Sequence, residues 1–528
     1  MSNATQILHS GKIYTLNPQQ PTATAIAIRE GKILQVGDDE EIIQAFLGAK
    51  KQHLGGNTVI PGLTDAHLHL KHYALNLQKV DCETDTRAEC LRRVAKRARQ
   101  TPPGTWILGH GWNQNAWPES YGSAADLDAV APHHPVYLTA KSLHAAWGNS
   151  RAFGVANINA QTPDPPGGWL SRDIHGHPTG LLFENAMSLV SDTIPEPSVP
   201  KLAEALREAQ SALLKMGLTG VHDFDRRLSF AALQTLHAQR ELKLRVLKNI
   251  AIENLPHAIE LGLRSGFGDD MLRMGGIKTF ADGALGPQTA AMLEPYQGTT
   301  DQRGVLLFTA SELFEECRRA AQNGLSMAIH AIGDRANRIV LDAYAQTRDY
   351  EREHHLPRLR HRIEHVQLIA PEDAARLSQL DVIASMQPLH ATSDMETADK
   401  YWGERAAHSY AWQTMLQHRT KLIFGSDAPV EVPNPFWGIH AAVTRRRPDG
   451  TPGPEGWFPS QRLSVGAALR AYTSGPAYAA GMEDRLGMLA PGYRADLLVL
   501  EVDPFACPPE ELRGMLPVAT MVEGEAVG

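Results

Sequence analysis

Short apolar runs separated by polar, turn-forming segments dominate the middle of the chain. Several runs have the length of buried strands, and amphipathic stretches such as 201–216 and 311–323 have the pattern of helices. Alternation of this kind is typical of a parallel α/β sheet, and at this length it predicts a (β/α)8 TIM barrel. The strands expected after the first are 135–140, 220–224, 275–280, 325–329, 361–366, 382–386 and 421–424.

The two ends of the chain have a different pattern, in which short β-prone runs are separated only by turns. Asn17-Pro18 and Glu30-Gly31 are turn signals near the amino end, and Pro491-Gly492 precedes an apolar run near the carboxyl end. We therefore expect residues 1–57 and 481–528 to form one composite β-sandwich domain. The barrel is expected to occupy residues 58–480 between them.

The segment after the first expected strand is too long for a single crossover helix. We predict an insertion over residues 73–198, whose Pro- and Gly-rich run 163–168 is typical of an exposed loop. Trp112 and Trp117 lie within it, and they either cover a pocket or belong to a local core.

The composition of the chain is typical of a soluble enzyme. The 528 residues are too many for one hydrophobic core, while 43% hydrophobic and 21% charged residues are ordinary for a soluble enzyme. A net charge of -8 without a long basic run argues against nucleic acid and anionic membranes as partners. Neither a signal peptide nor an 18-residue apolar stretch is present, so we expect no membrane span. The four cysteines lack metal or disulfide spacing, which predicts free thiols and a cytoplasmic location: Cys82, Cys90, Cys317 and Cys507.

The first candidate for chemistry is a His-x-His pair that follows the apolar lead-in 58–60 and a Pro-Gly step. Alternate side chains of a strand point to one face, so His67 and His69 are directed to the same point. Neutral imidazole nitrogens suit a divalent metal such as Zn²⁺. A single pair of this kind is usually ordinary, so the interpretation depends on further ligands elsewhere in the chain.

Further ligand types close the later strands. Lys278, His330, His365 and Asp427 each stand at or near the end of a separate expected strand. A lone strand-end aspartate usually caps a helix, and a lone histidine is usually just hydrogen-bonded. Because chemistry in such barrels lies at the carboxyl ends of the strands, the whole set in barrel order predicts a metal centre.

The chain resembles the amidohydrolase superfamily, and within it the YtcJ-like branch that includes N-substituted formamide deformylases. The resemblance covers nearly the whole sequence and implies a barrel, a composite β domain and metal-assisted hydrolysis. It rests on these segments: His67-x-His69, Lys278 with Phe280-Ala281-Asp282-Gly283-Ala284-Leu285-Gly286, His330-Ala331-Ile332-Gly333-Asp334, Arg362-Ile363-Glu364-His365, Gly425-Ser426-Asp427, and Pro491-Gly492-x-x-Ala495-Asp496-Leu497.

The resemblance implies one or two divalent metal ions, and zinc is the expected one. His67 and His69 would hold the first ion, and His330 and His365 the second. An ammonium cannot ligate, but a buried Lys278 loses its proton easily and can then form a carbamate with CO2, as in the binuclear members. The alternatives are an unmodified Lys278 beside a single metal, or a salt bridge from Lys278 to Asp282 or a neighbouring acid.

Asp427 is the expected general base and then general acid, and it also touches the first metal. His144 follows the expected strand 135–140 and resembles a site position of this branch, where it would hydrogen-bond the substrate or its carbonyl. The alternative for His144 is an ordinary satisfied histidine. The resemblance gives His222 no fixed role. Arg445-Arg446-Arg447 is interpreted as a solvated loop and not as an anion site.

The favoured function is metal-dependent hydrolysis of a carbon–nitrogen bond other than a peptide bond, with an N-substituted formamide or related small amide as substrate. Cyclic amide, imide or lactone hydrolysis stays open, because the same chemistry attacks those carbonyls. A ring deaminase is less favoured, since Asp334 and no glutamate follows His330. A non-enzymatic relative would have lost ligands that this chain keeps. A small-molecule amide is the expected partner, and a homodimer is left open.

Overall fold

The computed structural model describes residues 5–114, 117–142 and 144–527, so the outermost residues of the expected terminal domain lie outside it. The chain forms two compact units. Met1–Tyr73 and Leu202–Gly528 form the first, and Ala74–Lys201 forms the second. Among the described residues, no helix has the length and apolar character needed to cross a membrane.

The first unit is built on an eight-stranded parallel sheet in the order β21-β20-β19-β18-β17-β16-β15-β8. The sheet curves until its first and last strands meet, where the Asp427 amide donates to the His67 carbonyl at 2.7 Å. This confirms the predicted α/β barrel. The strands are β8 Leu63–Leu68, β15 Leu218–Asp223, β16 Arg245–Ala251, β17 Leu272–Phe280, β18 Met327–Ala331, β19 Arg362–His365, β20 Ile383–Met386 and β21 Leu422–Phe424.

Two strand assignments made from the sequence need correction. The run predicted at 135–140 is β11 (Val136–Ala140), which belongs to the second unit and not to the barrel. The second barrel strand is β15, and the third is β16, which the pattern did not reveal. Lys248 and Asn249 interrupt the apolar run of β16, although both are buried.

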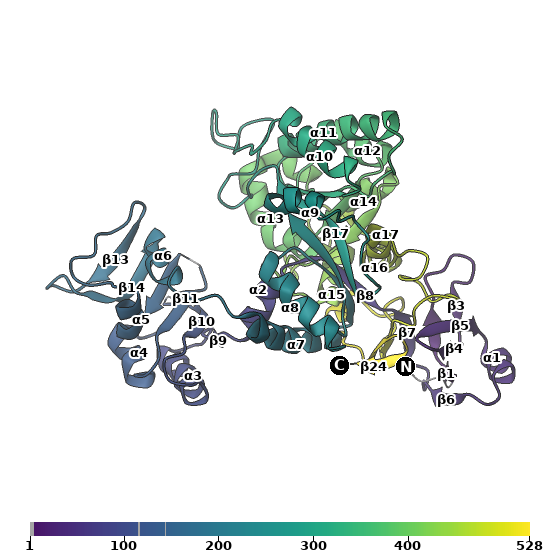
Figure 1. Ribbon diagram of the computed structural model, residues 1–528, viewed down its shortest axis with the longest axis horizontal. Helices are drawn as coiled ribbons and strands as arrows, with labels where there is room; N and C mark the ends of the chain where they lie inside the picture. Colours follow the sequence, from purple (N-terminus) through teal and green to yellow (C-terminus); the bar gives the residue numbers. More distant parts are fainter. Residues whose placement is uncertain (1–4, 115–116, 143, 528) are drawn as a thin grey trace. The chain divides into compact units, whose positions relative to one another are not determined.

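Helices between the strands bury apolar faces against the sheet, as the amphipathic pattern predicted. In α10 (Ala310–Gln322), Thr309 and Glu312 form a capping box, and the buried side includes Leu313 and Cys317. Figure 1 shows α10 beside α11 (Asp334–Glu353) in the green part of the chain. The other main helices of this unit are α8 Arg227–Ala238, α9 Leu255–Glu260, α12 Pro371–Gln379, α13 Pro388–Trp402, α14 Trp412–Gln417, α15 Pro435–Thr444, α16 Val465–Tyr472 and α17 Ser474–Ala480. The two boundaries between the units fall within α2 Leu70–Leu77 and within α7 Val199–Lys215.

Both ends of the chain contribute to one β layer. A six-stranded sheet has the order β24-β23-β22-β7-β2-β3, and β7 (Thr58–Pro61) pairs with β22 (Leu497–Leu500) and with β2 (Lys12–Tyr14). Figure 1 shows these purple and yellow strands side by side. A four-stranded sheet, β5-β4-β1-β6, packs with it around a shared core that includes Leu8 and Leu497. The remaining strands are β1 Gln6–His9, β3 Thr22–Ala23, β4 Ala25–Arg29, β5 Lys32–Gly37, β6 Lys50–His53, β23 Ala519–Val522 and β24 Glu525–Val527.

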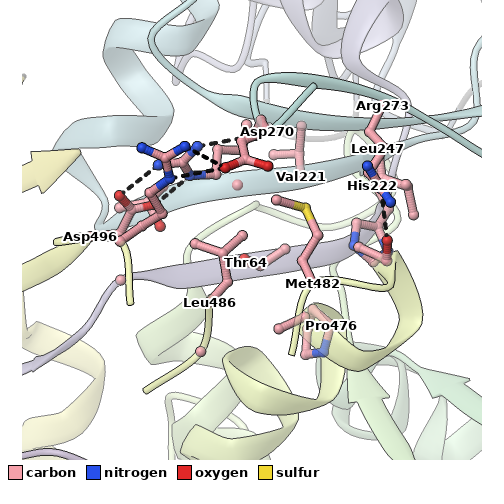
Figure 2. Close-up of a pocket in the computed structure, with 18 of the residues that line it drawn as sticks. Thr64, Val221, His222, Leu247, Asp270, Arg273, Pro476, Met482, Leu486 and Asp496 are labelled. Carbon is pink, nitrogen blue, oxygen red and sulfur yellow. Dashed lines mark hydrogen bonds and ion pairs between the residues drawn. The ribbon is translucent and has the colours of Figure 1, made fainter. Parts of the chain in front are cut away.

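A hollow of about 40 Å³ is lined by residues of the first barrel strands, among them Thr64 and Val221, and by residues near the carboxyl end of the chain, among them Asp496 (Figure 2). Four of its charged side chains form two pairs: Arg245 bonds Asp496 at 2.6 Å, and Arg494 bonds Asp270 at 2.6 Å. These pairs connect the carboxyl-terminal segment to the base of the barrel. The hollow therefore has a structural explanation.

The second unit contains a six-stranded sheet in the order β13-β14-β12-β11-β10-β9. Trp112 and Trp117 are buried in its core, and the Trp112 indole donates to the Leu138 carbonyl at 2.8 Å. The two tryptophans therefore belong to a local core. The main elements are β9 Val80–Asp81, α3 Arg87–Gln100, β10 Ile107–Trp112, α4 Ala124–Val130, β12 Ala145–Gly148, α5 Ser150–Val155, β13 Gly168–Arg172 and β14 Pro178–Glu184.

Candidate metal centre

Predicted ligands converge at the carboxyl ends of the barrel strands. His67 lies near the end of β8, His365 is the last residue of β19, and Asp427 follows β21. One donor atom from each of these three side chains lies within 4.8 Å of the others. Residues 67, 365 and 427 are far apart in the sequence, and only closure of the barrel brings them together.

His69 and His330 border this group. His69 Nε2 lies 3.4 Å from the Asp427 carboxylate, which His67 Nε2 approaches at 3.6 Å. The His330 ring packs against the His365 ring with centroids 4.6 Å apart. The structure thus brings the other three predicted histidines close to Asp427 or His365.

Burial keeps three of these imidazoles neutral. It lowers the pKa of His67, lowers that of His330 to about 3, and holds that of His365 well below its ordinary value. Burial alone would raise the pKa of Asp427, but the hydrogen bond from His69 and the neighbouring imidazoles bring it far below the ordinary value. Neutral imidazole and ionised carboxylate are the forms that bind a metal.

His69 differs because two acids face it. Burial would lower its pKa, but Asp225, 3.3 Å from Nδ1, and Asp427 raise it to about 9. A metal ion held by His69 would displace this proton, so binding there is coupled to proton release.

Lys278 on β17 points its amine into the same space. The side chain is buried, and Nζ has no hydrogen-bond partner among the described residues. The ring centroids of Phe280 and Phe224 lie 4.4 and 5.3 Å from Nζ. Burial lowers the pKa of Lys278 to about 8. A buried amine without a partner is a group that carboxylation or a nearby metal-bound ligand would satisfy.

The alternative salt bridge from Lys278 to Asp282 does not form among the described residues. The Asp282 carboxylate instead accepts backbone N–H groups of Ala291, Ile332 and Gly333, at 2.8–3.0 Å. Asp282 thus orders the loops beside His330 and leaves Lys278 free of an acid.

The ligands are held by a buried polar network. Glu364 accepts a hydrogen bond from His67 Nδ1 at 2.6 Å and pairs with Arg362, which also donates to His222 at 2.9 Å. Gln387 accepts from His365 Nδ1 at 2.8 Å. Hydrogen bonds of this kind fix the ring orientation of a metal-binding histidine and set which nitrogen faces the metal.

The seam between β8 and β21 forms one wall of the centre. The Asp65 carboxylate accepts from the backbone amides of His67 and Ser426, both at 3.0 Å, and from the Ser426 hydroxyl. Asp427 and His365 have φ of 59° and 77°, a left-handed conformation that costs a non-glycine residue about 1–3 kcal/mol. Such strain is common where side chains are aimed at a functional point.

Sequence reasoning missed several residues of this centre. His390, in the first turn of α13, is buried, and its Nε2 lacks a hydrogen-bond partner among the described residues while lying 3.8 Å from Asp427. Asp225, Gln387 and Glu364 orient the histidines. All four of these residues lie at or just beyond the end of a barrel strand. This position is the one feature of the sequence from which they could have been predicted.

His144 lies in the second unit. It is 71% exposed, and its Nδ1 is 2.9 Å from the Glu184 carboxylate. Its predicted role toward substrate stays a prediction.

The model of the amidohydrolase family matches residues 53–527. The chain belongs to the amidohydrolase family.

Similar amidohydrolase sequences cover almost the whole chain. Putative amidohydrolase YtcJ of Bacillus subtilis is 33% identical over 99% of both chains. The N-substituted formamide deformylase of Arthrobacter pascens is 30% identical, over 98% of this chain and 96% of its own. The crystal structure of an uncharacterized metal-dependent hydrolase from Pyrococcus furiosus is 30% identical with a TM-score of 0.79, covering 95% of this chain and all of the other.

Membership of the amidohydrolase family implies a hydrolase that uses divalent metal. The residues present fit such an ion. Neutral imidazoles, an ionised carboxylate and a buried amine without a partner face one point, and the donor atoms of three side chains already lie within 4.8 Å of each other.

Proposed function

We propose that this amidohydrolase cleaves the carbon–nitrogen bond of a small, non-peptide amide. The observation that carries the proposal is the convergence of His67, His365 and Asp427 beside the unpartnered amine of Lys278. Such a set of donors suits hydrolysis, because it can hold a cation, a nucleophilic water and a proton acceptor together.

His67 and His69 would hold one divalent ion and His330 and His365 a second, with zinc expected and Asp427 touching the first. Lys278, carboxylated by CO2, would join the two. Bound there, such ions polarise a carbonyl and bring the pKa of a water to about 7.

Asp427 would move the proton. It stays ionised because histidines face its buried carboxylate, so it can accept a proton from the attacking water. After the carbonyl carbon bonds the water oxygen, Asp427 would return this proton to the leaving nitrogen. The carbon–nitrogen bond then breaks and yields a carboxylic acid and an amine.

His390 would bind the substrate beside Asp427. Its buried Nε2 has no partner among the described residues, and a polar atom left in this state costs about 1–3 kcal/mol. A hydrogen bond to the carbonyl oxygen or the leaving nitrogen would satisfy it and orient the scissile bond.

An N-substituted formamide is the first substrate to test, because the deformylase of Arthrobacter pascens is 30% identical to this chain over nearly its full length. The screen would cover formamides, N-acyl amines, lactams and imides, with metal content measured on the same protein. Activity on a formamide or N-acyl amine together with bound divalent metal supports the proposal. Purified protein without metal, or activity confined to lactones, contradicts it.

Replacing Asp427 tests the mechanism. Asp427→Asn keeps the shape of the side chain but cannot accept the proton, so we expect kcat to fall by about 10²–10⁴-fold while most bound metal is retained. Asp449→Asn is the matched control, because Asp449 is exposed and its carboxylate accepts hydrogen bonds from Thr451 of its own loop. An Asp427→Asn variant with nearly full activity would refute this role.

A further inference from the structure

A second pocket lies between α15 and the short helix η5 (Pro509–Gly514), with a volume of about 300 Å³. Three arginines, one histidine and a single acid line it, and we call it the arginine pocket: Trp437, His440, Arg446, Arg447, Glu510 and Arg513. The function proposed above does not use it.

Several donors in the arginine pocket lack partners. The Nε atoms of Arg446 and Arg513 are buried without a hydrogen-bond partner among the described residues. The His440 side chain is also buried, and it lines the same hollow. Buried polar groups are normally satisfied, so the guanidinium groups of Arg446 and Arg513 beside this hollow are short of acceptors.

The pocket carries an excess of positive charge. Arg447 is engaged by Glu396, 2.5 Å away, and by the Thr392 carbonyl at 2.9 Å. Arg446 pairs with Glu510, whose side chain is 60% exposed. Arg513 has no carboxylate partner among the described residues and stacks on Trp437 at 4.1 Å. One guanidinium charge is thus left over, in a chain whose net charge is -8.

His440 adds a neutral donor or acceptor. Burial lowers its pKa, and the charges of Arg446 and Arg513 lower it further. The imidazole therefore does not add to the positive charge, and it can hydrogen-bond a ligand that the arginines attract.

The interpretation of 445–447 as a solvated loop is wrong for its first residue. Arg445 is fully buried, and its guanidinium lies 4.6 and 5.1 Å from the rings of Trp412 and Trp457 and donates to the Tyr410 carbonyl at 3.0 Å. This anchor fixes the chain just before Arg446. The arginine pocket is therefore held in place before any ligand arrives, which lowers the entropic cost of binding.

We propose that the arginine pocket binds a phosphate-type oxyanion, either inorganic phosphate or the phosphate group of a small ester. Guanidinium groups present paired N–H donors that match oxyanion geometry, and charge-assisted hydrogen bonds of this type are about twice as strong as neutral ones. Arg446 and Arg513 supply the charged donors, His440 the neutral one.

This site is distinct from the metal centre. Helix α15 begins shortly after Asp427 and runs for 10 residues, a length of about 15 Å at 1.5 Å per residue. His440 lies within this helix and Arg446 just after it, and none of the residues that line the arginine pocket is a predicted metal ligand. The proposal therefore stands or falls independently of the reaction catalysed.

Calorimetric titration of the full-length, metal-loaded protein with inorganic phosphate, at constant ionic strength, tests the proposal. A second titration with glycerol 3-phosphate distinguishes free phosphate from an ester. We expect saturable binding at one site per chain, weakened by at least about tenfold in Arg513→Met, which keeps the packing on Trp437 but loses the charge. Arg513→Lys keeps the charge without the forked donors, and we expect an intermediate affinity.

Two further variants control the assignment. Arg462→Met removes an arginine whose acidic partner is the exposed Glu455, and it should bind phosphate like the unmodified protein. His365→Ala disturbs the metal centre and should also leave the affinity unchanged. No saturable binding, equal binding in Arg513→Met, or loss of binding only in His365→Ala would each overturn the proposal, the last by placing phosphate at the metal centre.

Discussion

Replacing Glu364 by glutamine would test whether the polar network stabilises the barrel and the metal centre together. The carboxylate is fully buried and bonds His67 on one oxygen and Arg362 on the other. Burial alone would raise its pKa, but Arg362 and His67 hold it far below the ordinary value, so the group is ionised at neutral pH. Glu364→Gln keeps the size of the side chain and removes this charge.

The expected loss is large because solvent cannot compensate. The Arg362 side chain is 5% exposed, and removal of one partner from a buried ion pair typically costs about 3–5 kcal/mol. Glutamine can still accept one hydrogen bond, so we expect a loss near the lower limit, about 3 kcal/mol in the free energy of unfolding. Metal affinity should fall about 10–100-fold, because the amide orients the His67 ring less firmly.

The assay is urea unfolding of chelated protein, paired with a chelator competition for zinc affinity. Glu483→Gln is the matched control: Glu483 also pairs with an arginine, Arg360, but these side chains are 42% and 30% exposed, and such a pair contributes about 0–1 kcal/mol. If Glu364→Gln changed stability and zinc affinity as little as Glu483→Gln, the reasoning about the network would be wrong.

Two more predictions concern Lys278 and Gly425. With a pKa of about 8, about one Lys278 amine in ten is neutral at pH 7, against about one in three thousand for an ordinary lysine. The rate of Lys278 carboxylation in chelated protein can be measured by carbon-13 NMR at a fixed concentration of dissolved CO2. We expect this rate to rise about tenfold per pH unit below pH 8 and to level off above it. A rate that does not change from pH 6 to 8 would contradict this. In Gly425→Ala, the new Cβ would lie 2.4 Å from the His67 amide nitrogen, so we expect a loss of about 1–3 kcal/mol in the free energy of unfolding and lower metal content. Gly286→Ala meets nothing within 4 Å and should not change either quantity, and equal behaviour of the two variants would refute the argument.

The barrel could be predicted because apolar periodicity recurs along the chain, but periodicity does not say which sheet a strand joins. Residues 136–140 are as apolar as a barrel strand, yet they pair with β10 and β12 in the second unit. Strand β16 was not predicted for the opposite reason: Lys248 and Asn249 give a buried barrel strand a polar sequence. Both errors come from tertiary contacts that a local pattern does not contain.

The candidate ligands could be predicted because each stands at a strand end, where barrel topology gathers side chains. The residues that orient the ligands could not be predicted, because the role of each depends on a single contact with a residue far away in the sequence. Glu364 meets His67 across 297 residues, and nothing near Glu364 in the sequence indicates this partner. His390 likewise became recognisable only when its unpartnered nitrogen was found beside Asp427.

The place where β8 meets β21 has a consequence for biosynthesis. His67 and Asp427 face each other across that junction, and Asp427 lies about four fifths of the way along the 528 residues. That share of the chain must therefore be synthesised before these two candidate ligands can meet. The complete set of predicted ligands therefore comes together only after the last barrel strand has been translated.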